Sequence, residues 1–516
     1  MINIYQFIKN NKFFFKKKIN NNFNNIVLVE YNRIHASLIG YSYLSNVIAN
    51  KYKANIFSYK YEVKKNIIKI VFWKIFVLFN LGVVAIYRSF GVKSFIYANA
   101  SYKKKKIYEK LSYKILKKIR NKEDILNLKI FNIYVGDLIY DSYLMFYKKP
   151  TIDIYDNKFV SFFVYSVINF FFWYDFFKKN KVSAVITSHA VYTLAIPARI
   201  AVSKNILAYQ CTAEAIYRLS KNRLYGWLEF KDYKKIFSKL PKKIQEKSLI
   251  IAKNKLQKRF SGSVSTDVRG STKSAYIKHK YEPVIKKNKN IKILIATHCF
   301  FDNPHPYGLN FFSDFNDWLL FLGKLSEKKN NYDFYLKLHP DYLKGTKQII
   351  DKFLLQYNKI KLIDSKYSHH QIIREGIDFA LTTWGSIGHE YPYFNISVIN
   401  ASVNNPHINY NFNINPKNLN EYKKILNNLE ILNTKKIKIN KSQLIEFYAM
   451  HYVLKKDWLF IDLKKTAYDL GGYNMLFTTN IYKEWLKEIN AKRHIKIINQ
   501  LKLFLKSNKY CNISAI

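Results

Sequence analysis

The residues best suited to chemistry lie where apolar runs of strand length end. The segment Lys337-Leu338-His339-Pro340 follows one such run, and a proline directly after a histidine restricts the backbone there. The lysine and the imidazole are therefore presented at a defined place, and together they suit a phosphate. We predict that Lys337 and His339 bind an anionic ligand. The competing interpretation is a pair that caps a turn on a surface loop.

A second polar segment, residues 383–390, follows another apolar run. Gly385 and Gly388 flank the start of an expected helix, where glycine lets a ligand approach the N–H groups at the positive end of the helix dipole. Glu390, one turn into that helix, could accept a hydrogen bond from a ribose hydroxyl. The candidate donor-binding residues of this segment are Thr383, Gly385, Ser386, Gly388, His389 and Glu390.

A third group, His298, Asp302 and His305, follows the first apolar run in a loop that also holds two prolines. Two interpretations stay open: a loop held by its own His and Asp side chains, or a contact with the donor. The chain has no Asp-x-Asp sequence, a pair of acids that commonly holds a divalent ion against a phosphate. We therefore predict no metal and a bound phosphate neutralised by Lys, His and helix N-termini.

Five apolar runs position these residues, and they read as buried parallel strands because they are nearly continuous instead of alternating. Helix-period stretches separate them, which predicts an open, doubly wound sheet. Ligands of such sheets bind at the carboxyl ends of the strands, where the polar residues lie. The runs are residues 291–297, 332–338, 359–363, 378–382 and 396–400.

A second α/β region covers residues 26–220. Residues 25–30 read as a strand, 36–51 as its helix and 54–59 as the next strand, which opens another Rossmann-like unit. Further strands are expected at 182–189 and 206–210, again with polar residues at their carboxyl ends. The repetition implies two facing domains with a cleft between them.

An acceptor hydroxyl needs a general base, and the first half of the chain carries the candidates. Asp137 and Asp141 are the leading carboxylates, because acidic residues are scarce in this chain, and His189 is the leading imidazole. The residues expected to hold the acceptor are Arg33, His35, Tyr192 and Arg199. For Arg33 and His35 the alternative is solvation of a helix start.

The strings HCFFDNPHPYG, FFSDFNDWLLFL, LKLHPD and TTWGSIGHEYPYFNISVINAS resemble the nucleotide-binding half of bacterial capsule and surface-polysaccharide biosynthesis proteins of the GT-B type. That group is similar to the capsular Kdo transferases, the polysialyltransferases and, more remotely, the teichoic-acid glycerophosphotransferases, which carry a Lys-x-His-Pro-like element. The resemblance covers residues 285–430 closely and the N-terminal half loosely.

The resemblance implies that Lys337 and His339 contact the donor phosphate, that Ser386 and the turn at 385–388 contact the phosphates or the sugar, and that Glu390 contacts the ribose. The chain has Thr-Thr-Trp-Gly-Ser where the sialyltransferase-like enzymes have a serine run, which leaves CMP and UDP both open as the donor's nucleotide. No cofactor is implied beyond the nucleotide-sugar substrate.

The composition is strongly basic, with 86 Lys and Arg against 35 Asp and Glu and a net charge of +51. Because Lys, Asn, Ile, Tyr and Phe are all abundant together, as an AT-rich genome would produce, we do not read the charge as nucleic-acid binding. It suits a membrane surface or an anionic glycan and sugar nucleotide. Apolar stretches at 71–87 and 159–177 fall short of the roughly 20 clean apolar residues of a spanning helix, and read as buried core helices or as interfacial ones.

Three cysteines without regular spacing indicate a reducing compartment, and the N-terminus does not read as a signal peptide. We expect a cytoplasmic protein with peripheral contact to the inner face of the membrane. The expected fold is α/β, with two facing Rossmann-like domains (GT-B-like) and C-terminal helices that pack back. The expected parts are a basic extension at 1–24, an acceptor domain at 25–250, a linker at 251–284, a nucleotide-sugar domain at 285–435 and helices at 436–516.

The expected function is metal-independent glycosyl transfer from a nucleotide sugar to a glycan or lipid-linked acceptor in bacterial surface-polysaccharide synthesis. Two alternatives remain open. One is a polyol-phosphate transferase that uses the same phosphate-binding loop. The other is a non-catalytic interaction protein of a capsule assembly complex.

Overall fold

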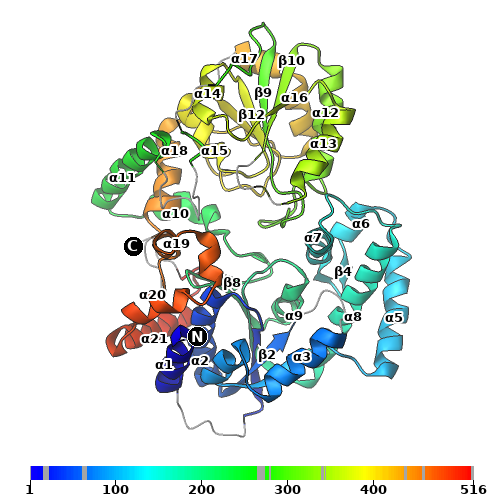
Figure 1. Cartoon of the computed structure of the whole chain (residues 1–516), viewed down its shortest axis with the longest axis vertical. Coiled ribbons are helices and arrows are strands. Elements are labelled where there is room, and N and C mark those ends of the chain that lie inside the picture. Colours follow the sequence, from blue (N-terminus) through cyan, green and yellow to red (C-terminus); the bar gives the residue numbers. More distant parts are fainter. Residues whose placement is uncertain are drawn as a thin grey trace.

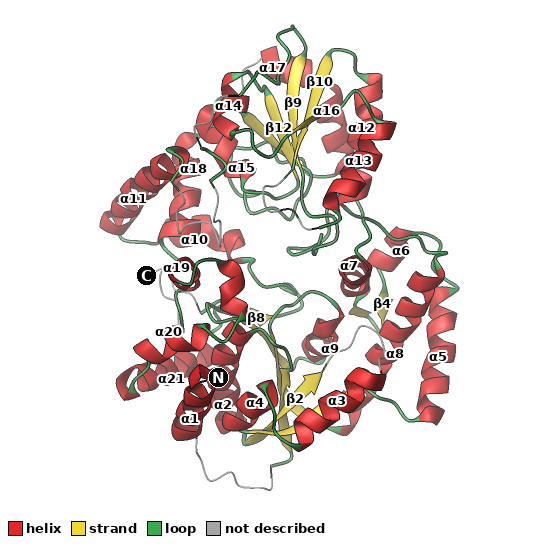
Figure 2. Ribbon diagram, viewed as in Figure 1, coloured by secondary structure: helices red, strands yellow, loops and turns green. Residues whose placement is uncertain are grey.

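The chain forms two α/β domains, with a set of C-terminal helices packed beside the first (Figure 1). The structure is a computed structural model that describes residues 2–15, 23–60, 67–263, 274–277, 281–338, 342, 344–434, 438–455 and 460–512. Figure 2 shows the two sheets in separate domains, each flanked by helices.

The first domain is built on a six-stranded sheet in the order β3-β2-β1-β6-β7-β8. Five of these strands are parallel, and β8 is antiparallel to β7. The strand order reverses between β1 and β6, and Val27, Leu28 and Val29 of β1 are fully buried because helices cover both faces. The strands are β1 Asn25–Glu30, β2 Ala54–Lys60, β3 Val92–Tyr97, β6 Lys181–Thr187, β7 Leu207–Cys211 and β8 Ile216–Leu219.

Helices surround this sheet, and a short antiparallel pair, β4 Lys129–Ile130 with β5 Ile133–Tyr134, precedes α7. The helices are α1 Ile2–Phe15, α2 His35–Tyr52, α3 Ile67–Leu78, α4 Val83–Ser89, α5 Tyr102–Leu116, α6 Lys122–Leu126, α7 Gly136–Tyr147, α8 Asn157–Lys179 and α9 Ile196–Ser203. Two helices after β8, α10 Tyr233–Phe237 and α11 Lys242–Phe260, lie in a separate buried cluster.

By length and composition alone, α8 is long and apolar enough to cross a membrane, and about half of its most apolar window (56%) is buried inside the protein. Asp156 caps its start by accepting the N–H of Lys158. Phe163, Val167 and Phe170 of α8 are fully buried in the core of the first domain. The packing therefore agrees with a core helix.

The second domain has a five-stranded parallel sheet in the order β11-β10-β9-β12-β13. Each of the five apolar runs forms the expected strand, so the predicted doubly wound sheet is confirmed. The elements are β9 Ile291–Ala296, α12 Phe315–Lys328, β10 Tyr332–Lys337, α13 Thr346–Gln356, β11 Lys361–Ile363, α14 His369–Arg374, β12 Phe379–Thr382, α15 Ile387–Glu390, β13 Ser397–Asn400, α16 Leu419–Asn427 and α17 Leu429–Thr434.

The C-terminal helices pack back onto the first domain, as predicted. Tyr482 stacks on Phe7 of α1 with ring centroids 4.1 Å apart, and Trp485 is buried in the same cluster. The segment at 1–24, expected as an extension, thus contains a packed helix. These helices are α19 Leu463–Asp469, α20 Ile481–Glu488 and α21 Ala491–Lys506, whereas α18 Lys441–Tyr448 packs against α11.

The connection between the domains differs from the expected linker at 251–284, because α11 continues to Phe260. Ala252, Leu256 and Phe260 of α11 are buried against the helices that follow the second domain. The helix therefore continues into the first part of the expected linker, before the small polar residues begin.

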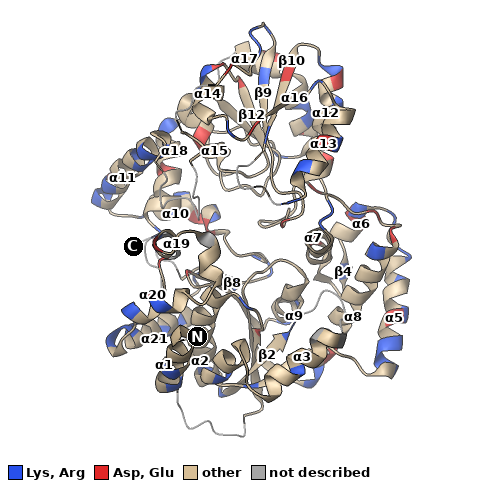
Figure 3. Cartoon of the chain, in the orientation of Figure 1, with Lys and Arg blue, Asp and Glu red and all other residues tan. Residues whose placement is uncertain are grey.

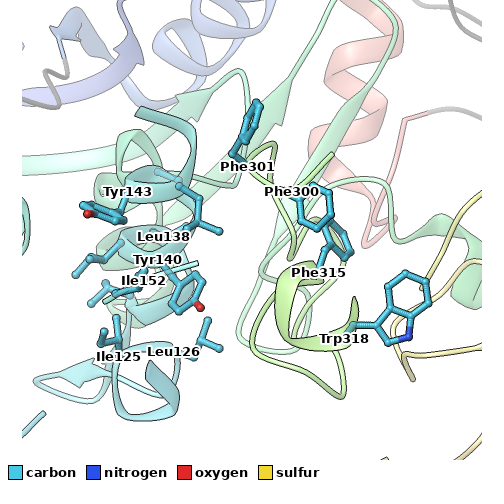
Figure 4. Close-up of a cluster of buried hydrophobic side chains, with 14 of the residues drawn as sticks. Ile125, Leu126, Leu138, Tyr140, Tyr143, Ile152, Phe300, Phe301, Phe315 and Trp318 are labelled. Carbon is cyan, nitrogen blue, oxygen red and sulfur yellow. The ribbon is translucent and has the colours of Figure 1, made fainter. Parts of the chain in front are cut away.

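One hydrophobic core runs through both domains. Leu138 and Tyr140 of α7 belong to the same buried cluster as Phe300 and Phe315 of the second domain, and Figure 4 shows the two groups facing each other. The domains therefore meet through a packed apolar contact. This contact fixes the positions of the site residues of one domain relative to those of the other.

Candidate active site

The strand order of the second sheet reverses between β9 and β12, which is the place where open α/β sheets bind their ligands. His298 follows β9, and its Nε2 accepts the N–H of Thr383, 3.3 Å away, at the end of β12. Thr382 Oγ1 lies 3.0 Å from the same nitrogen and accepts the N–H of Gly385 at 3.1 Å. The predicted residues His298, Thr383 and Gly385 are thus brought together at one place.

Trp384 lies at the centre of this group. Its ring is 4.4 Å from that of His298, 5.7 Å from Tyr307 and 5.9 Å from Phe315, measured between centroids. Its Nε1 is buried and has no hydrogen-bond partner among the described residues. A buried donor of this kind is expected to meet a ligand or a water. Trp384 is not among the residues predicted from the sequence, since an aromatic side chain there reads equally well as core.

Asp141 and His305 form a buried pair between the two domains. Asp141 lies on α7, and its Oδ1 is 2.6 Å from Nδ1 of His305, while Oδ2 accepts the His305 backbone N–H at 3.2 Å. Both side chains are buried, at 2% and 0% exposure. Nε2 of His305 has no partner among the described residues. The prediction placed these residues in different roles, and the fold joins them.

The two pKa shifts of this pair favour keeping one proton between its members. Burial raises the pKa of Asp141. Burial alone would lower the pKa of His305, but the Asp141 carboxylate outweighs it and the pKa of His305 is raised. With Nδ1–H directed at the carboxylate, a neutral imidazole offers Nε2 as its acceptor. This is the arrangement of a general base oriented by a carboxylate.

A second contact joins the strand-end loops of the two domains. Tyr192, after β6, donates its hydroxyl to Asp302, after β9, at 2.7 Å. Tyr192 has φ 61°, a left-handed conformation that a bulky residue rarely adopts, and it directly precedes a short 3-10 turn at Thr193–Ala195. The carboxyl-end loops of the two sheets therefore face each other, as predicted.

In the first domain, where the strand order reverses between β1 and β6, a chain of hydrogen bonds links Glu30 to His189. Ser188 Oγ donates to Oε2 of Glu30 at 2.9 Å, and Nδ1 of His189 lies 2.9 Å from the same Oγ. Glu30 is buried and also accepts from the backbone N–H of Ser188 at 2.6 Å. Because the serine proton goes to Glu30, His189 Nδ1 is the donor to Oγ. Sequence reasoning missed Glu30, although a carboxylate ending a buried strand was a usable signal.

Asp137 and Arg199 occupy a different place from the one predicted. Arg199 Nη2 binds Asp137 Oδ2 at 2.7 Å, and the hydroxyl of Tyr225 donates to the same oxygen at 2.7 Å. Both charged side chains are buried, so the pair is a structural one. Burial alone would lower the pKa of Arg199, but Asp137 outweighs it and the pKa is raised. The base role of Asp137 and the acceptor role of Arg199 are corrected accordingly.

Lys337 also departs from its predicted role. Its Nζ is 2.8 Å from the carbonyl of Tyr367, 3.2 Å from that of Asp364 and 3.4 Å from that of Ser365, which engages all three of its protons. Burial lowers the pKa of Lys337 to about 8. It therefore holds the loop after β11 instead of a phosphate. His339 lies outside the described residues.

Two further residues predicted to bind the donor, Gly388 and His389, are packed inside the second domain. A Cβ on Gly388 would lie 2.4 Å from His407 Cε1, so this glycine makes room for a histidine and not for a ligand. His389 Nδ1 lies 3.2 Å from His407 Nε2, and burial lowers the pKa of His389 to about 4. The helix α15 is a single turn, with Ser386 exposed at its start.

Glu390 is buried as well, and its partner comes from α11. It forms an ion pair with Arg259 and accepts the hydroxyl of Tyr276 at 2.9 Å. Burial alone would raise the pKa of Glu390, but Arg259 holds it at about 2. The predicted ribose contact is corrected to a structural pair that links α11 to the second domain.

The remaining acceptor candidates lie at the start of α2. Arg33 is exposed, whereas Nδ1 of His35 lies 2.8 Å from the hydroxyl of Tyr482 on α20. His35 therefore helps to seat a C-terminal helix. Among the described residues no three His, Cys, Asp or Glu side chains come together to hold a metal ion.

No protein-family model matches the sequence, and no curated protein matches it. Solved structures similar to the chain include a UDP-GlcNAc 2-epimerase from Neisseria meningitidis bound to UDP-GlcNAc, at 10% identity and a TM-score of 0.26, covering 83% of this chain and 98% of that one. Thermosulfurimonas dismutans KpsC, a beta Kdo 2,4 transferase, has 12% identity and a TM-score of 0.32, over 53% of this chain and 80% of that one.

A glycosyltransferase from Rickettsia africae is similar at 13% identity and a TM-score of 0.22, over 91% of this chain and 100% of that one. At such TM-scores the similarity decides neither fold nor function. Both rest on the geometry of the chain itself.

Proposed function

We propose that the chain is a glycosyltransferase that moves a sugar from a nucleotide-activated donor to an acceptor held between its two domains. The observation that carries this proposal is the Asp141–His305 pair, in which a carboxylate of the first domain orients an imidazole of the second and leaves its Nε2 without a partner among the described residues. An oriented imidazole between two facing strand-end loops suits the deprotonation of a bound hydroxyl.

In this mechanism Nε2 of His305 removes the proton from the acceptor hydroxyl, which then attacks the anomeric carbon of the donor. The carbon–oxygen bond to the nucleotide breaks, and the electron pair leaves with the phosphate. Asp141 stabilises the imidazolium that forms. The departing nucleotide belongs at the carboxyl ends of β9 and β12, beside His298, Thr383, the Trp384 indole N–H and the exposed Ser386.

His189 has a separate place in this scheme, in the first domain. Its Nδ1 is bound to Ser188, which is bound to Glu30, so its orientation is fixed. We assign it to acceptor binding. The finer assignment is surface-polysaccharide synthesis in bacteria, without a metal, from a CMP- or UDP-linked sugar to a glycan or lipid-linked acceptor.

A thermal-shift screen of CMP, UDP, GDP and their sugars tests this proposal. One nucleotide class should stabilise the protein, by about 2.7 kcal/mol when present at about one hundred times its dissociation constant. His305→Gln should show the same shift, because the base lies apart from the nucleotide. If no nucleotide or nucleotide sugar stabilises the protein, the transferase assignment is wrong and the non-catalytic interpretation replaces it.

A further inference from the structure

Helix α3 presents an apolar face to solvent. Ile68 is 68% exposed, Phe72 59% and Leu78 73%, values that are unusual for such side chains in a folded domain. The α3 apolar face consists of Ile68, Val71, Phe72, Ile75, Phe76 and Leu78, and continues into Phe79 and Leu81 after the helix.

The opposite side of α3 is anchored, so the exposure belongs to a seated helix. Trp73 is 8% exposed, and its ring lies 6.4 Å from Phe95 and 5.8 Å from Tyr97, both on β3. The ammonium of Lys60 on β2 lies 5.3 Å from the centre of the same ring. The helix is therefore held against the edge of the sheet while its outer face has no cover from the described residues.

The dimensions of α3 exclude a crossing of the bilayer. Its 12 residues span about 18 Å, whereas the hydrocarbon core is about 30 Å thick. By length and composition, Ile70–Leu78 of α3 and Val83–Ser89 of α4 could together form one broken membrane span, with a bend of 44° between them. But Val84, Ile86 and Tyr87 of α4 are fully buried in the first domain, so α4 is unavailable to lipid. The helix can only lie in the plane of an interface.

Cations surround the α3 apolar face. A groove of about 570 Å³ at its C-terminal end is lined by Val77, Leu78 and the basic residues Lys12 and Arg88. Lys74 is exposed on the helix itself. Near the other end, β3 leads within a few residues into the basic run at the start of α5, and Figure 3 shows blue residues on α5.

We propose that the α3 apolar face is a docking surface for an anionic lipid bilayer, with α3 lying in the headgroup region and Lys12, Lys74 and Arg88 at its border. The charge of the chain selects lipid over a second copy of the chain. A copy would bring another net charge of +51 to a basic surface, which repels it, whereas anionic headgroups attract that surface. This proposal does not depend on the transferase assignment.

The test is flotation of the full chain with vesicles of phosphatidylglycerol and phosphatidylethanolamine, compared with phosphatidylcholine vesicles. The variant Phe72→Ser/Ile75→Ser removes two exposed side chains and should leave the fold intact, as circular dichroism and thermal unfolding will check. The control, Leu355→Ser/Ile250→Ser, removes two apolar side chains from α13 and α11 that are more exposed, at 85% and 63%, than Phe72 and Ile75, at 59% and 40%.

The wild type and the control should float with the anionic vesicles. The α3 variant should partition about 100-fold less, because two buried apolar side chains are lost from the lipid contact. Lys12→Glu/Lys74→Glu should weaken binding at low salt more than at high salt. Equal flotation of the α3 variant and the control would overturn the proposal, and so would a wild type that ignores anionic vesicles. If the wild type and the control form an oligomer, the α3 variant does not, and none of them binds vesicles, the α3 apolar face contacts a second copy of the chain instead.

Discussion

His305 has one ring nitrogen bound to Asp141 and the other without a partner among the described residues. A buried polar atom left unpaired costs about 1–3 kcal/mol, which a chain retains only where something else satisfies it. Nε1 of Trp384, just after β12, is likewise buried without a hydrogen-bond partner among the described residues. Both atoms lie on loops at the carboxyl ends of strands, so a ligand between the domains is the simplest partner for them.

At residue scale, Lys337→Met should leave nucleotide affinity unchanged. The ammonium is bound to three carbonyls of the loop after β11, so it has no proton left for a phosphate. Its pKa is lowered to about 8 from 10.5, so the unfolded state binds more protons between these values and the wild-type stability should rise with pH there.

Lys337→Met should lose that rise in stability, measured by urea unfolding at several pH values beside a nucleotide titration. Lys347→Met on exposed α13 is the control and should change neither quantity. Weakened nucleotide binding with an unchanged pH profile would restore the phosphate role of Lys337.

Glu390→Gln should destabilise the protein in a way that depends on pH. Its pKa is held at about 2 by Arg259, against 4.5 ordinarily, so its contribution is fully present above pH 4.5 and is lost as pH falls towards 2. The shift corresponds to about 3 kcal/mol. Denaturant unfolding at neutral pH should show that loss, and the gap from wild type should close in acid.

The exposed pair of Glu327 and Lys359 supplies the comparison. Glu327→Gln should cost below about 1 kcal/mol at any pH, because an exposed ion pair contributes little. A Glu390→Gln protein as stable as wild type at neutral pH would show that the pair with Arg259 is not formed.

At the scale of elements, α7 and the start of α12 form a clamp between the domains. Asp314 caps α12 by accepting the N–H of Asp317, and it also accepts the hydroxyls of Tyr140 at 2.5 Å and Thr151 at 2.6 Å. One carboxylate thus starts a helix of the second domain and binds two side chains of the first. Lys122 adds an ion pair to Asp317 at 2.6 Å.

A double-mutant cycle of Tyr140→Phe and Asp314→Asn should give a coupling energy of about 1.5–3 kcal/mol in unfolding free energy, as expected for a hydrogen bond to a charged group. Asparagine is also a good cap, so the helix start is retained and the cycle isolates the contact between domains. Additive effects of the two changes would mean that the clamp does not couple the domains.

The sequence predicted the strands of both domains well, because buried parallel strands are nearly continuous apolar runs and leave little ambiguity. It did not predict which polar residues line the site. Lys337 ends a strand of the second sheet, yet its side chain turns to the loop after β11, and spacing does not show that direction. Glu390 was misread because its partner, Arg259, lies in a segment that read as linker. The partners Asp141 and His305 lie in different domains, and only the fold brings them together.

At the scale of the whole molecule, the shared core and the buried Asp141–His305 pair join the two domains. Both pKa values are raised in the folded chain, so the pair binds a proton more tightly there than in the unfolded chain. Its contribution to the free energy of unfolding is therefore largest below the ordinary pKa of histidine and falls as pH rises through the raised pKa of His305.

The most direct test of this account is the turnover number of His305→Gln, measured as nucleotide release with the donor that the screen identifies. The kcat should fall by about 10²–10⁴-fold while the donor's dissociation constant stays unchanged, because a general base is lost and the residues beside the nucleotide are not touched. The control is His494→Gln, which should retain full activity. The imidazole of His494 on α21 lies 3.1 Å from the hydroxyl of Tyr43 on α2, away from the site. A His305→Gln enzyme with wild-type kcat would contradict the account.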